Sequence, residues 1–106
     1  MYSTGKVAAE ALKTAIFYEF YDDFADVCLA LILIYRSQMI VAENQKEADW
    51  NYEQIKRAEK ALSIYCKSEN EDEAMDKLLL AELEDFSSAL LRIDYSILLK
   101  EVPSNV

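Results

Sequence analysis

The chain contains one glycine, Gly5, and one proline, Pro103, both close to its ends. Average usage is roughly 7% for glycine and 5% for proline. Turns between β-strands need residues that tolerate positive φ, and glycine is the default supplier. About a hundred consecutive residues without either one therefore favour helices joined by short loops.

The composition fits one folded domain. The chain has 106 residues, of which 53% are hydrophobic and 29% charged, unlike the polar mixtures typical of disorder. The most apolar run spans residues 27–35 and is flanked by Asp26 and Arg36. A membrane span needs roughly 20 such residues, so this run predicts a buried helix and no membrane association.

Apolar periodicity and three polar breaks predict four helices, over about 4–21, 24–43, 47–67 and 71–102. The breaks contain Asp23, Asn44 and Asn70, which are suited to cap or end helices, and Ser68 is spaced from Glu71 as in a capping box. The predicted fold is all-α, an antiparallel four-helix bundle with a long C-terminal helix, in a single domain over 1–106.

The two terminal helices carry more apolar surface than one bundle uses. The main stripe of 71–102 is Met75, Leu79, Leu83, Phe86, Leu90, Ile93 and Ile97. Further apolar residues lie on second faces of the first and last helices: Leu12, Ile16, Phe20, Leu91, Tyr95, Leu98 and Val102. An exposed apolar patch of this kind predicts a homodimer interface. Alternatively, the last helix bends at 87–88 and covers the patch.

No motif predicts catalysis or cofactor binding. The chain has no histidine, which removes the commonest general base and metal ligand, and one glycine cannot build a phosphate-binding loop. A calcium-binding loop motif is also missing. Cys28 and Cys66 stand alone without a C-x-x-C partner, and the N-terminal residues do not resemble a secretory signal. We therefore expect a cytoplasmic protein that is not an enzyme and holds no metal or cofactor.

Acidic residues exceed basic ones by 20 to 11, giving a formal net charge of −9. This excess disfavours direct binding to nucleic acid or an anionic membrane and favours a basic protein partner. Two clusters predict the partner-binding surface. The first contains Glu19, Tyr21, Asp22, Asp23 and Asp26, and the second contains Glu69, Glu71, Asp72, Glu73 and Asp76. They occupy the first and third interhelical turns, which lie at the same end of an up-down-up-down bundle.

The expected function is a small protein–protein interaction module, an adaptor, chaperone or neutralising partner, which binds a basic surface through an acidic pole with exposed aromatic rings such as Phe24. The alternative is an inhibitor that mimics nucleic acid and blocks a DNA- or RNA-binding enzyme, of the anti-restriction, anti-CRISPR or nuclease-immunity type. A small-ligand carrier would need an enclosed apolar cavity. The acidic residues could also serve only helix capping and solubility.

Overall fold

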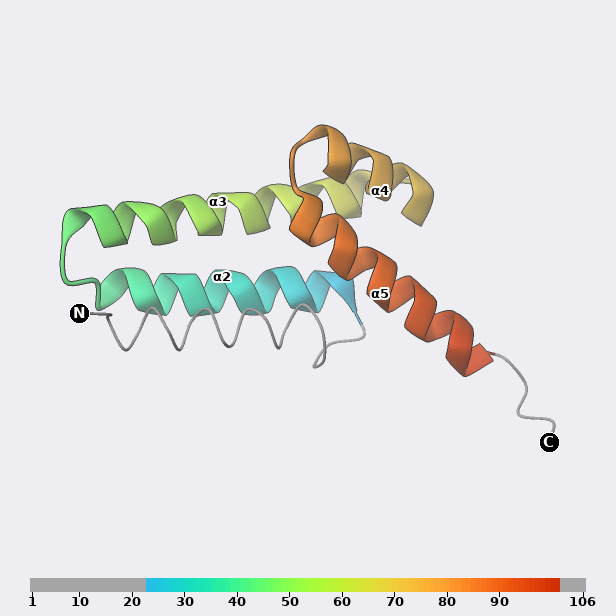
Figure 1. Ribbon diagram of the computed structural model, residues 1–106, viewed down its shortest axis with the longest axis horizontal. Helices are drawn as coiled ribbons and strands as arrows, with labels where there is room; N and C mark the ends of the chain where they lie inside the picture. The colour runs from blue at the N-terminus through green and yellow to red at the C-terminus, as the bar shows by residue number, and fades with distance from the viewer. Residues whose placement is uncertain (1–22, 102–106) are drawn as a thin grey trace.

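The computed structural model describes residues 23–101, with side chains for 23–93. These residues form four helices and no strand: α2 (Phe24–Ile40), α3 (Gln45–Lys67), α4 (Glu71–Leu80) and α5 (Glu84–Glu101) (Figure 1). The all-helical prediction is confirmed for this part of the chain, while the predicted helix 4–21 lies outside it. No helix among the described residues has the length and apolar character needed to cross a bilayer.

Side-chain caps fix the starts of three helices. The side chain of Asp23 accepts a hydrogen bond from the Ala25 N–H at 2.8 Å at the start of α2. Asn44 and Asn70 accept from the amides of Glu47 and Glu73, each also at 2.8 Å. Asparagine thus begins α3 and α4, and the capping role expected of Ser68 belongs to Asn70. Each cap satisfies a donor that the first helical turn leaves unpaired.

The pair α2–α3 forms the longest interface in the described part of the chain. The two helices lie side by side and antiparallel, joined by a short loop (Figure 1). From α2 the buried side chains are Phe24, Val27, Cys28, Leu31 and Tyr35. They meet Ile55, Ala58 and Ala61 of α3 in one hydrophobic core. The fully buried alanines carry little bulk, which lets the larger α2 residues fill the space between the helices.

The predicted long C-terminal helix over 71–102 is wrong, because the helix breaks between Leu80 and Glu84. Glu82 adopts the left-handed conformation with φ of 61°. The amides of Glu82 and Leu83 donate to the carbonyls of Leu79 and Leu78, at 3.1 and 2.9 Å. This hydrogen-bond pattern is a Schellman motif, which usually places glycine at the left-handed position. The break lies well before the bend considered at 87–88.

The break changes which leucines are buried. Leu78 is buried on α4, whereas Leu79 of the predicted stripe is half exposed. After the break, Leu83 and Phe86 begin a buried stripe that continues along α5. A straight helix would place Leu78 and Leu83 about 140° apart around its axis. The Schellman turn removes this mismatch, so both leucines reach the same core.

The helix α5 crosses the end of the α2–α3 pair and extends away from it, with α4 lying over the end of α3 (Figure 1). Phe86 is buried with its ring centroid 6.4 Å from that of Phe24. Asp85 receives two hydrogen bonds from the Arg57 guanidinium, at 2.7 and 2.9 Å. These contacts tie α5 to both helices of the pair. The antiparallel arrangement of four helices, with 4–21 as a member, stays a prediction.

Candidate functional site

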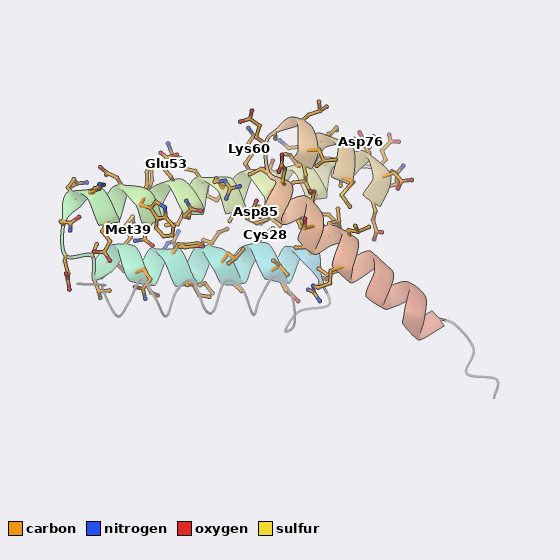
Figure 2. All side chains as sticks on the ribbon, viewed as in Figure 1. Cys28, Met39, Glu53, Lys60, Asp76 and Asp85 are labelled. Atoms are coloured by element: carbon orange, nitrogen blue, oxygen red, sulfur yellow. The ribbon has the colours of Figure 1, made fainter. Side chains whose placement is uncertain are left out.

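The described members of the two predicted acidic clusters lie where three helix ends meet. α2 begins at this end, α3 finishes at it, and α4 starts from it (Figure 1). Figure 2 shows Asp76 on α4 toward this end and Met39 of α2 toward the opposite one. Because α2 and α3 are antiparallel, residues 23–26 come close to the α3–α4 turn. We call this region the acidic end and define it by residues 23–26 and 65–76.

Tyr65 connects the two acidic clusters. Its ring centroid lies 4.9 Å from that of Phe24, which directly follows the Asp23 cap. Burial of the ring raises the pKa of the Tyr65 hydroxyl, and the negative charges of Asp23 and Glu71 raise it further. A carboxylate from each cluster therefore acts on the same tyrosine, although the two are far apart in the sequence.

Two of the acidic residues have local structural roles. Asp23 is the cap of α2. Glu73 accepts a hydrogen bond from the Glu69 amide at 2.7 Å and pairs with the ammonium group of Lys77 at 2.8 Å. These hydrogen bonds to Lys77 and the Glu69 amide lower the pKa of Glu73. Asp23 and Glu73 thus stabilise helix starts, as the capping interpretation expects.

Four other carboxylates at the acidic end cap no helix, although Asp26 and Asp72 lie in the first turns of α2 and α4. Asp26, Glu69, Asp72 and Asp76 are all exposed. Among the described residues, none of the four side chains takes part in a hydrogen bond or ion pair. Exposed carboxylates that are bound to nothing within the fold are free to receive the cationic groups of another molecule.

A hollow of about 360 Å³ opens at the α3–α4 turn. It is lined by Tyr65, Cys66, Ser68, Glu69, Asn70 and Glu71. Of these, only Glu69 and Glu71 were predicted as site residues. The helical spacing of Ala58, Leu62 and Tyr65 predicts that Tyr65 belongs to the buried stripe of α3, and nothing in this pattern shows that the stripe reaches the surface at the helix end.

The prediction of exposed aromatic rings beside the acids is wrong for Phe24. Phe24 is only 1% exposed, because it packs between Tyr65 and Phe86. The ring that reaches the surface at the acidic end is that of Tyr65, which is partly buried. The surface is therefore carboxylate-rich with one accessible phenol, and Phe24 belongs to the core beneath it.

Several predicted residues lie outside the described part of the chain. From the partner-binding set these are Glu19, Tyr21 and Asp22, and from the dimer set Leu12, Ile16, Phe20 and Val102. The side chains of Tyr95 and Leu98 also lie outside the described ones. Leu91 is described and is 60% exposed. The dimer interface proposed for these residues thus stays a prediction.

Over residues 23–93, no three cysteine or carboxylate side chains are grouped so as to hold a metal ion. Cys66 is exposed beside the hollow, whereas Cys28 is buried in the α2–α3 core. Burial, followed by the nearby charges of Cys66 and Asp23, raises the pKa of the Cys28 thiol to about 12. Cys28 is therefore held as a neutral core side chain.

The chain matches no protein-family model, no curated protein and no solved structure.

Proposed function

We propose that the protein is a small interaction module that binds a basic protein surface through the acidic end. The observation that carries the proposal is that the start of α2, with its Asp23 cap, packs against Tyr65, which lines the same hollow as Glu71 of α4. Helix capping alone explains a carboxylate at the start of one helix. It does not require the starts of two helices to share one small surface.

The unpaired carboxylates add to this support. Asp26, Glu69, Asp72 and Asp76 are exposed. A surface on which carboxylates outnumber ammonium groups attracts a basic protein and speeds the encounter between the two. Lysine and arginine side chains of the partner would pair with Glu69, Asp72 and Asp76 at the α3–α4 turn and on α4. The Tyr65 ring offers an apolar and aromatic face beside them.

The structure indicates which carboxylates to change. Asp23 and Glu73 should stay, because they cap helices. The informative variant is Glu69→Gln with Asp72→Asn and Asp76→Asn, which removes three charges and keeps the side-chain shapes. A matched control is Glu43→Gln with Glu53→Gln and Glu59→Gln, three exposed residues on or next to α3 away from the acidic end.

The binding experiment uses a lysine- and arginine-rich peptide as the probe, titrated into isotopically labelled protein. We expect amide chemical-shift changes concentrated at Tyr65–Asp76, weakened strongly by the first variant and little by the control. Affinity should fall steeply between about 50 and 200 mM salt, because exposed charge pairs are screened. Equal weakening in both variants would mean that only net charge matters, and the proposal would fail.

Mimicry of nucleic acid uses the same carboxylates but a different class of partner. Binding to a DNA- or RNA-binding enzyme that is competed away by duplex DNA would identify this function. Binding to a basic protein surface that DNA leaves unaffected would identify the interaction module. The three-charge variant weakens both, so competition is the measurement that separates them.

A further inference from the structure

The helix α2 carries a second, exposed stripe on the side opposite its buried residues. The exposed positions are Asp26, Leu29, Leu33, Arg36 and Ile40, spaced three, four, three and four residues apart. At 100° per residue they fall within an arc of about 80°. This is the spacing of a helix that packs against another helix. We call it the outer stripe of α2.

The outer stripe is more apolar than an ordinary solvated face. Leu29, Leu33 and Ile40 are 48%, 63% and 77% exposed. The two charged members, Asp26 and Arg36, form no ion pair within the described residues. Three large apolar side chains in line, with one unpaired charge of each sign, are typical of a surface that another molecule covers.

We propose that the outer stripe of α2 binds the outer stripe of a second copy of the chain, with the two α2 helices antiparallel. Charge complementarity selects the second copy as the occupant. Asp26 lies five residues before Leu31 and Arg36 five residues after it, while Leu29 and Leu33 lie two before and two after. A two-fold axis at the level of Leu31 therefore brings Asp26 to Arg36 of the other copy and Leu29 to its Leu33.

The same pattern excludes the parallel arrangement. Parallel helices in register would place Asp26 against Asp26 and Arg36 against Arg36, and like charges in contact are repulsive. The antiparallel pair has two opposite-charge contacts flanking two leucine contacts. Leucine packing supplies the attraction, and the charges fix the direction and register. A single pair of short helices buries a small interface, so we expect a weak dimer that dissociates on dilution.

Two charge-reversed variants test the pairing. In Arg36→Glu alone, the introduced carboxylate faces Asp26 of the other copy, and in Asp26→Lys alone, the introduced ammonium group faces Arg36. Each variant alone should dimerise at least about tenfold more weakly than the wild type, measured by sedimentation equilibrium. An equimolar mixture of the two variants should form a heterodimer with nearly wild-type affinity, because both contacts then join opposite charges. Circular dichroism checks that each variant stays helical.

Two leucine substitutions, one inside the outer stripe and one outside it, test whether apolar contacts of the stripe hold the dimer together. Leu33→Asp places a charge at the centre of the outer stripe and should abolish the dimer. Leu80→Asp changes the most exposed large apolar residue among those described and should leave the dimer intact. A wild type that is monomeric at every concentration, with stability lowered by Leu33→Asp, would assign the stripe to the predicted helix 4–21 and overturn the proposal.

Two further outcomes also overturn the proposed dimer: mixed charge variants that do not associate, or a Leu80→Asp variant that acts like Leu33→Asp. Peptide binding at the acidic end is measured separately, with the variant that changes Glu69, Asp72 and Asp76. Either proposal can therefore fail alone.

Discussion

The two halves of the described chain, α2–α3 and α4–α5, are held together in different ways. α2 and α3 pack along their lengths around a core that includes Leu31, Ala58 and Ala61. α4 and α5 meet at an angle and depend on fewer anchors, chiefly the Schellman turn, Phe86 and the Arg57–Asp85 pair. A core made of many contacts loses little stability when one contact is removed. A junction with few contacts loses more when any one of them is removed. Substitutions in the two halves should therefore differ in how much stability they remove.

The largest effect is expected at Phe86, which joins the two halves. Its ring lies near Phe24 and beneath the Arg57 guanidinium, whose central carbon is 5.7 Å from the ring centroid. Phe86→Ala should lower the free energy of unfolding by about 3–5 kcal/mol, from lost burial and the cavity left behind. The measurement is urea unfolding followed by circular dichroism. Leu80→Ala, at an 85% exposed position, should change it by less than about 0.5 kcal/mol. If Phe86→Ala and Leu80→Ala lowered the free energy of unfolding equally, Phe86 would not anchor α5 as described.

The two cysteines test how closed the α2–α3 core is. Iodoacetamide should alkylate exposed Cys66 in the native protein at least about a hundredfold faster than buried Cys28. Mass spectrometry of digested samples measures both rates. Adding urea should remove the difference, since unfolding exposes both thiols. If Cys28 and Cys66 were alkylated at comparable rates in the native protein, the α2–α3 core would open readily.

The raised pKa of the Cys28 thiol predicts that the protein loses stability at alkaline pH. The pKa of Cys28 is about 12 in the fold against an ordinary value of 9.0. Below pH 9 the thiol is protonated in both states, so its contribution to stability is complete. As the pH rises from 9 toward 12, the unfolded chain loses the proton first and stability falls. The wild type should therefore lose more stability than Cys28→Ala between pH 8 and 10, and parallel losses would refute the shift.

A smaller effect is expected from the ion pair that connects α3 to α5. The side chains of Arg57 and Asp85 are 32% and 30% exposed, so water screens part of their attraction. A double-mutant cycle with Arg57→Ala and Asp85→Ala should give a coupling of about 0.5–1.5 kcal/mol, because the contact is bidentate. The single-bonded pair Glu73–Lys77 is the matched comparison and should couple less. A coupling near zero for Arg57–Asp85 would mean that the ion pair does not help to anchor α5 to α3.

The two halves also differ in how far the sequence predicts them. The apolar periodicity and the polar breaks predicted the bounds of α2 and α3 to within a few residues. Each of these helices has a clear apolar stripe and begins after an Asp or Asn cap. In α4, three consecutive leucines at 78–80 supply two candidate stripes. The prediction took Leu79, whereas packing buries Leu78. The break itself was missed, since the left-handed residue is Glu82 and not glycine.

The sequence predicted which segments come together at the candidate site, because the order and direction of the helices determine this. It did not predict which side chains there are buried or cap a helix, because these depend on packing. Antiparallel α2 and α3 bring Phe24, directly after the Asp23 cap, into contact with Tyr65 at the end of α3. Which carboxylates cap helices depends on local geometry, and here Glu73 is used while Asp72 is not. The burial of Phe24 follows from α5 crossing the end of the pair, which no local pattern in the sequence records.

The smallest expected effect tests the residue that made the α4–α5 junction hard to predict. A side chain at positive φ costs about 1–2 kcal/mol, and glycine avoids this cost. Glycine also makes the unfolded chain more flexible, which offsets about 0.4–1 kcal/mol. Glu82→Gly should thus raise the free energy of unfolding by about 0.5–1 kcal/mol, seen as a higher urea midpoint. Glu59→Gly, at an exposed position inside α3, should lower the free energy of unfolding by about 1 kcal/mol.

Glu82→Ala separates the effect of backbone conformation from that of charge, because alanine removes the carboxylate but keeps the Cβ atom. Stabilisation by alanine as large as by glycine would mean that charge, and not the left-handed backbone, limits the stability of this turn.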